Sequence, residues 1–143
     1  MYDVLSHLTI LLVEDDPDLR DALEFTLRRQ GHTVVPFECG EEAERWLQDE
    51  LPDAAVLDMM LPRTSGFLLA QRVKERSGGR VPVIMMSGNT SPAHRDYAFA
   101  SGADRFLAKP FSTSTLEQAL QALLRPRPRN SGSGRTSMSQ TRR

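Results

Sequence analysis

The stretch LTILLVEDDPDL, residues 8–19, contains the two patterns from which the fold can be worked out. Residues 8–13 are uncharged and mostly aliphatic, as expected of a strand that is buried on both faces of a parallel sheet. Glu14, Asp15 and Asp16 follow in succession, and Pro17 comes next. An acidic residue before a proline is typical of a helix start, with Asp16 as the N-cap. The stretch therefore predicts a buried strand, a short acidic loop and a helix.

The same alternation continues along the chain. Short apolar runs that predict further strands occupy residues 33–37, 53–58, 81–87 and 105–108. Helical spacing of apolar residues follows Pro17 as far as Gly31 and returns at about 40–49, 65–77, 91–101 and 112–124. Strands that alternate with helices predict an α/β fold, a (βα)5 doubly wound five-stranded parallel sheet. Right-handed crossovers then place helices on both faces of the sheet.

Composition divides the chain into two unlike parts. Residues 1–124 hold all 19 acidic residues, whereas residues 125–143 hold six arginines and no acid. The first part is long enough for one domain with its own core, and the second predicts a disordered basic tail or linker. That tail lacks aromatic residues, so we do not expect the chain as given to bind nucleic acid. No run approaches the roughly 20 apolar residues of a membrane span, which predicts a cytoplasmic protein with no membrane contact.

Charged and polar residues follow the predicted strands at the point where each strand ends. Glu14 and Asp15 follow the first, Asp58 ends the third, Ser87 ends the fourth and Lys109 follows the fifth. Carboxyl ends of parallel strands meet at one edge of such a sheet, where ligands bind. Two carboxylates about 4 Å apart repel by about 4 kcal/mol at an effective dielectric near 20, so the cluster favours a bound cation. Oxygen ligands alone favour Mg²⁺ or Mn²⁺ over Zn²⁺.

Four segments in this order carry a resemblance to a known family: LLVEDDPDLR, AVLDMMLPRTSGF, VIMMSGN and GADRFLAKPF. Together they resemble the receiver domain of two-component response regulators, over roughly residues 8–124. The resemblance implies a flavodoxin-like sheet with strand order 2-1-3-4-5. It also implies that Asp58 accepts a phosphoryl group from a sensor histidine kinase or a histidine phosphotransfer protein. Lys109 and Ser87 would then contact the phosphoryl oxygens.

The resemblance also assigns a metal site and a control of phosphate lifetime. Glu14, Asp15 and Asp58 would hold Mg²⁺ together with the backbone carbonyl of Met60, with Asp15 in direct contact and Glu14 acting through water. The side chains of Met60 and Asn89 would flank the path of the water that attacks the aspartyl phosphate. Because a thioether is only a weak hydrogen-bond acceptor, we expect slow hydrolysis.

The same family pattern implies a switch. Ser87 would move toward the phosphoryl group, and Phe106 would rotate into the space that it leaves. Phe106 as an ordinary core residue fits the sequence equally well. The surface expected to change comprises residues 91–101, 105–108 and 112–124, which would bind a downstream protein or support a phosphorylation-dependent dimer.

Two other functions have to be weighed against a stand-alone receiver. Haloacid-dehalogenase-type phosphatases also use an aspartate at a strand end, but they carry a second aspartate two residues later, where this chain has Met60. We therefore expect no enzyme activity apart from autocatalysed phosphotransfer and slow autodephosphorylation. The alternative is a receiver fragment of a longer DNA-binding transcriptional regulator, although residues 1–143 contain no helix-turn-helix pattern.

Overall fold

The computed structural model describes residues 7–124 and shows one sheet of five parallel strands in the order β2-β1-β3-β4-β5. The strands are β1 (Thr9–Val13), β2 (Thr33–Phe37), β3 (Ala54–Asp58), β4 (Val83–Ser87) and β5 (Arg105–Ala108). The helices are α1 (Pro17–Arg29), α2 (Gly40–Asp49), α3 (Gly66–Ser77), α4 (Pro92–Ala100) and α5 (Thr113–Leu124). The predicted (βα)5 sheet and its strand order are confirmed. The predicted basic tail, residues 125–143, lies outside the described residues.

Helix starts follow the capping residues of the sequence. Asp16 is the N-cap of α1, as predicted, and its side chain accepts a hydrogen bond from the Asp18 N–H. Ser65 and Ser91, which the sequence pattern placed inside their helices, are the N-caps of α3 and α4. Each serine hydroxyl satisfies a backbone N–H that the first turn of the helix leaves unpaired. The predictions for α3 and α4 therefore start one residue too early.

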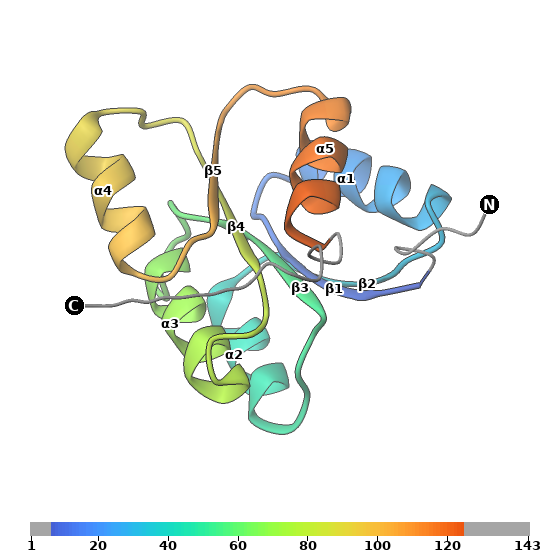
Figure 1. Cartoon of the computed structure of the whole chain (residues 1–143), viewed down its shortest axis with the longest axis horizontal. Helices are drawn as coiled ribbons and strands as arrows, with labels where there is room; N and C mark the ends of the chain where they lie inside the picture. The colour runs from blue at the N-terminus through green and yellow to red at the C-terminus, as the bar shows by residue number, and fades with distance from the viewer. Residues whose placement is uncertain (1–6, 125–143) are drawn as a thin grey trace, which may run out of the picture.

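The helices cover the two faces of the sheet (Figure 1). Alternate residues of each strand point to opposite faces, so Ile10 and Leu12 pack with α1 and α5, while Leu11 and Val13 pack with α2, α3 and α4. Each face therefore has its own apolar layer, and every residue of β3 and β4 is buried. Strands buried on both faces explain the uninterrupted apolar runs in the sequence.

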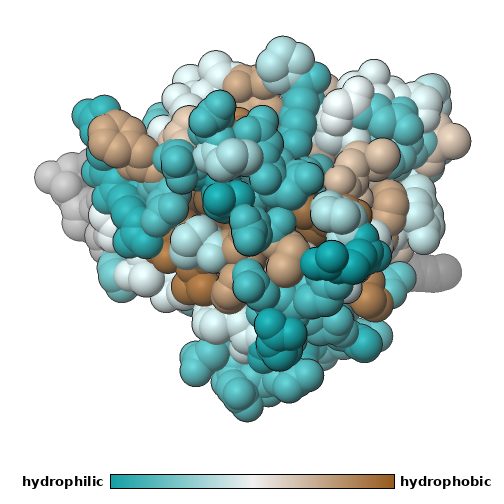
Figure 2. Space-filling model, turned by 180° about the vertical axis from the view of Figure 1, so that it is seen from behind, coloured by the Kyte–Doolittle hydropathy of each residue, from teal (hydrophilic) through white to brown (hydrophobic). Residues whose placement is uncertain are grey.

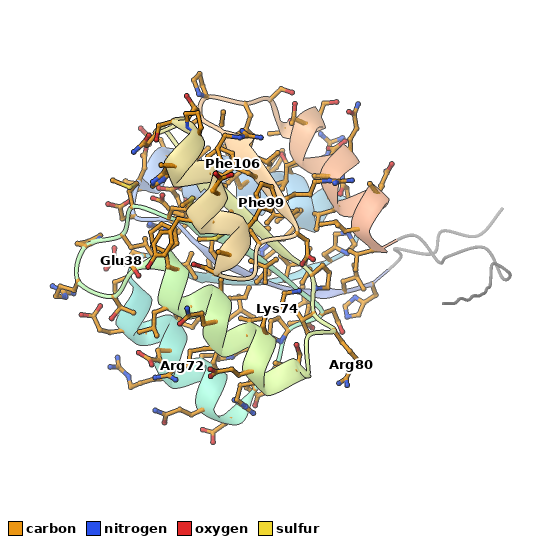
Figure 3. All side chains as sticks on the ribbon, turned by 60° about the vertical axis from the view of Figure 1, so that its left-hand side comes forward. Glu38, Arg72, Lys74, Arg80, Phe99 and Phe106 are labelled. Atoms are coloured by element: carbon orange, nitrogen blue, oxygen red, sulfur yellow. The ribbon has the colours of Figure 1, made fainter. Side chains whose placement is uncertain are left out.

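The helix α4 is less firmly anchored than its neighbours. Of its nine residues, all within the described part of the chain, Ala98 alone is buried, whereas α3 buries five. Tyr97 and Phe99 of α4 are exposed. Phe99 is labelled in Figure 3. By contrast, Lys74 of α3 binds Asp104 just before β5, with 2.7 Å between Nζ and Oδ2. The helix α3 is thus tied to the sheet by charge as well as by apolar packing.

One face of the molecule has a mostly polar surface (Figure 2). Figure 2 shows one face of the molecule, on which hydrophobic residues form separate patches among hydrophilic ones. None of the helices between residues 7 and 124 has the length and apolar character needed to cross a bilayer.

Candidate functional site

The strand register brings the predicted residues to one edge of the sheet. Val13 of β1 lies beside Leu57 of β3, so Glu14 and Asp58 follow at the same level. Ser87 of β4 pairs with Ala108 of β5. Lys109 follows Ala108 in the chain and therefore lies at the same edge of the sheet as the end of β4. The expectation that the carboxyl ends of the strands carry the site agrees with this arrangement.

Lys109 connects two of the carboxylates. Its Nζ lies 2.7 Å from Oε1 of Glu14 and 3.4 Å from Oδ2 of Asp58. Burial opposes the charged form of the lysine, but the hydrogen bond to Glu14 and the charges of Asp58 and Glu14 outweigh it, so the pKa of Lys109 is raised. The lysine therefore stays an ammonium across the physiological pH range. The sequence did not predict its ion pair with Glu14.

Glu14 is fully buried at the end of β1. Burial raises the pKa of Glu14 to about 7, and the nearby charge of Asp58 acts in the same direction. Hydrogen bonds from Lys109 and from the Asp16 N–H, which is 3.0 Å from Oε2, offset only part of this effect. One ammonium thus does not fully compensate the acidic cluster.

The acidic cluster suits a divalent cation. Glu14, Asp15 and Asp58 each offer a carboxylate oxygen, and these atoms lie within 4.8 Å of one another. Glu14 and Asp58 are buried, whereas Asp15 is open to solvent. A cluster that offers only oxygens and carries uncompensated negative charge fits Mg²⁺. These residues fit the predicted cofactor.

Asp58 is held in a defined orientation. Its Oδ1 accepts a hydrogen bond of 3.0 Å from the Met60 N–H, and its Oδ2 faces Lys109. Gly66, the first residue of α3, packs against the same strand end, because a Cβ at this position would lie 2.2 Å from the Asp58 carbonyl oxygen. The backbone around Asp58 is therefore fixed by contacts on both sides.

Ser87 has two partners that restrain its hydroxyl. Oγ accepts a hydrogen bond of 3.0 Å from the Asn89 N–H and shares a second, also 3.0 Å, with Nε2 of His94. His94 was not among the residues predicted from the sequence to contribute to the site, so this contact was missed. The available signal was the short link between Ser87 and Pro92, which sets the first turn of α4 over the end of β4.

The remaining predicted residues surround this edge. Phe106 of β5 is buried against α4, as Figure 3 shows, with the Arg95 guanidinium 4.7 Å from its ring centroid. The side chain of Met60 is 57% exposed. Asn89 is also exposed, and its side-chain oxygen accepts a hydrogen bond from the Ser91 N–H at the start of α4. Their predicted effect on phosphate lifetime stays a prediction.

Comparison with known families gives one match that covers most of the chain. The profile of the response regulator receiver domain matches residues 10–121. The transcriptional regulatory protein AfsQ1 of Streptomyces coelicolor is 35% identical over 123 residues, which are 86% of this chain and 54% of AfsQ1. The phosphate regulon regulator PhoB of Rhizobium meliloti is 39% identical over 81% of this chain and 52% of its own. The chain thus spans about half the length of these curated relatives.

Solved structures agree with this match. The BeF3-activated receiver domain of DrrB, a Thermotoga maritima protein, superposes with a TM-score of 0.77 at 27% identity and covers 84% of this chain and 99% of its own. The receiver domain of the sensor histidine kinase PA1611 of Pseudomonas aeruginosa superposes with a TM-score of 0.74 at 31% identity, covering 82% and 98%. That structure has a magnesium ion coordinated in its active-site cleft.

Proposed function

Because the chain belongs to the response regulator receiver domain family of two-component systems, we propose that it accepts a phosphoryl group on Asp58 from a phosphohistidine. The donor is a sensor histidine kinase or a histidine phosphotransfer protein. The observation that carries the proposal is the setting of Asp58: a buried carboxylate at the end of β3, with one oxygen held by the Met60 N–H and the other facing Lys109.

The proposed transfer needs a nucleophile and a way to neutralise charge. A carboxylate oxygen of Asp58 attacks phosphorus, the P–N bond of the phosphohistidine breaks, and its electron pair stays on the departing imidazole. Asp15, Asp58, the Met60 carbonyl and, through water, Glu14 would hold Mg²⁺, which would supply positive charge to offset that of the phosphoryl oxygens. The Ser87 hydroxyl donates to one of those oxygens after it turns away from its present partners.

The proposed role of Lys109 in the transfer depends on its contacts with the carboxylates of Glu14 and Asp58. In the structure it lies closer to Glu14, at 2.7 Å, than to Asp58, at 3.4 Å. Transfer places the negative charge of the phosphoryl group beyond Asp58, and the Lys109 ammonium can turn toward it. A bound cation would then compensate Glu14. The Lys109 ammonium therefore exchanges the Glu14 carboxylate for the phosphoryl group and stays paired with an anion throughout.

The proposed output is a change in the surface formed by α4, β5 and α5. Ser87 and Phe106 lie where β4 and β5 meet α4, so movement of these two side chains reaches that surface directly. A downstream protein or a phosphorylation-dependent second copy binds there, in the cytoplasm. Slow loss of phosphate from Asp58 is the only hydrolysis that we propose.

A second candidate is the receiver part of a longer DNA-binding regulator. The observation that favours it is coverage: more than four fifths of this chain match about half the length of AfsQ1 and PhoB, both transcriptional regulators by name. Both candidates share the chemistry at Asp58. Sequencing the complete reading frame distinguishes them, because only the second requires an output domain.

The acceptor can be tested by intact-mass measurement after incubation with acetyl phosphate and Mg²⁺. We expect a gain of about 80 Da, the mass of one phosphoryl group, in the wild type and none in Asp58→Asn. Asp53→Asn is the matched control, since Asp53 precedes the same strand at its opposite end and accepts a hydrogen bond from the Thr9 N–H. It should gain the full mass. A full gain in Asp58→Asn, or none in the wild type, would disprove the assignment.

A further inference from the structure

One side chain of α4 contacts both residues of the proposed switch. Nε2 of His94 lies 3.0 Å from Oγ of Ser87 at the end of β4. The same ring meets the Phe106 ring of β5 edge-on, with centroids 6.4 Å apart and planes at 82°. Ser87 and Phe106 lie on neighbouring strands, so His94 bridges them.

Two aromatic rings contact the His94 ring. Besides Phe106, Phe67 of α3 packs against it in an edge contact with centroids 5.8 Å apart. Arg95, the next residue of α4, places its guanidinium 4.7 Å from the centroid of Phe106, which adds a cation–π contact on the same ring. The first turn of α4 therefore restrains both switch residues in the present arrangement.

The hydroxyl of Ser87 has one proton to donate and two lone pairs that can accept hydrogen bonds. Oγ already accepts the Asn89 N–H. When the proton of a neutral His94 is on Nδ1, Ser87 donates its single proton to Nε2, and none remains for a phosphoryl oxygen. When the proton is on Nε2, His94 donates to the second lone pair of Oγ. In both tautomers Ser87 loses this hydrogen bond when its side chain rotates away from α4.

We propose that His94 is a positioning residue that latches Ser87 and Phe106 in the unphosphorylated arrangement. A phosphoryl group on Asp58 then competes with His94 for the Ser87 hydroxyl. The inference rests on the proposed function, because it requires Asp58 to carry the phosphoryl group. It adds that this chain opposes its own activation by one hydrogen bond from α4.

The size of the effect follows from the net strength of such a bond. Because the bond exists in one arrangement and is lost in the other, its removal should favour the activated arrangement roughly threefold to tenfold. Replacement of His94 by Phe removes the ring nitrogens and keeps a ring that can contact Phe67 and Phe106. His94→Gln keeps a side chain that can hydrogen-bond to Ser87, and is the matched control.

The test is the affinity of the full chain for beryllofluoride, the activator named in the DrrB structure, in the presence of Mg²⁺. NMR titration can follow the Asn89 amide, which donates to Ser87. We expect His94→Phe to lower the Kd roughly threefold to tenfold, and His94→Gln to remain near the wild type. In a Ser87→Ala background, His94→Phe should have no effect, because the partner of the latch is already missing.

A second readout uses the wild type alone and does not depend on how the variants fold. The ¹⁵N shift of His94 Nε2 should change when beryllofluoride binds, because its hydrogen bond to Ser87 is lost. An unchanged Nε2 shift in the bound protein would refute the latch, as would a His94→Phe variant with wild-type or weaker affinity. Equal tightening in the Ser87→Ala background, or in His94→Gln, would refute it too. If beryllofluoride does not bind the wild type, the proposed function fails and the latch fails with it.

Discussion

Replacing Gly66 by Ala tests how strictly the backbone around Asp58 is fixed. The added Cβ would lie 2.2 Å from the Asp58 carbonyl oxygen and 3.0 Å from both the Asp58 carbonyl carbon and the Met59 Cα. All three are backbone atoms, so no side chain can rotate to relieve the contact. Because ordinary contacts begin at 3.4 Å, the start of α3 or the end of β3 must shift by about 1 Å.

Two opposing terms decide the sign of the stability change. Alanine improves helix propensity by at most about 1 kcal/mol relative to glycine, and less at the first helical position. Forcing an extra carbon into a packed site costs about 1–3 kcal/mol or more. We therefore expect Gly66→Ala to lower the free energy of unfolding by about 1–3 kcal/mol. Phosphorylation of Asp58 should slow by up to about 100-fold, because a misplacement near 1 Å can cost that much.

Urea unfolding and the rate of phosphorylation by acetyl phosphate measure the two effects. Gly88→Ala is the matched control: it follows Ser87 at the same edge of the sheet, and a Cβ there would meet no atom within 4 Å. Its unfolding free energy should stay within about 0.5 kcal/mol of the wild type. If Gly66→Ala matched the wild type in both assays, the close contact with Asp58 would not position the acceptor.

Three further predictions concern the acidic cluster and the phosphate. Between pH 4.5 and about 7 the folded protein binds a proton at Glu14 more tightly than the unfolded chain, so Mg²⁺-free stability should fall as the pH rises through this window. Urea unfolding of Glu14→Gln should lack that fall, and an identical pH profile would contradict the raised pKa. Asp15→Asn should weaken Mg²⁺ binding at least tenfold by calorimetry and leave the unfolding free energy nearly unchanged, since Asp15 is exposed; normal affinity would show that Asp15 is not a ligand. Met60→Asn should shorten the lifetime of phosphorylated Asp58 about tenfold to a hundredfold, measured by loss of the added mass, with Mg²⁺ affinity unchanged. A lifetime that stays the same or lengthens would mean that this position does not control water access.

The order of strands and helices could be predicted from the sequence because both patterns are local. Uninterrupted apolar runs such as residues 8–13 indicate strands buried on both faces, and Asp16 before Pro17 marks the start of a helix. The edge that carries the site then follows from the parallel arrangement, which is why Asp58 and Lys109 could be expected to meet. The predicted starts of α3 and α4 were one residue early, since periodicity does not separate a capping serine from the first helical residue.

The partners within the site were harder to predict because they depend on three-dimensional detail. The sequence shows that Lys109 and Glu14 share an edge, but their 2.7 Å ion pair depends on how deeply each side chain is buried. The Lys109–Pro110 peptide bond is cis, and the sequence is consistent with either isomer. His94 reaches Ser87 only because α4 has a particular rotation about its own axis, which the weak apolar pattern of that helix does not define.

Because α4 has few buried residues, it is the helix that we expect to open locally before the others. Displacing α3 would expose Leu69, Ala70 and Val73 to water, whereas α4 has one buried residue of its own, Ala98, and its displacement would also uncover the Phe106 ring of β5. Since the cost of exposing apolar surface scales with its area, α4 has the smaller barrier to opening. Its amide protons should therefore exchange with solvent through excursions that leave the sheet intact. Opening of α4 should therefore cost less than unfolding of the whole domain, for which about 5–15 kcal/mol is typical.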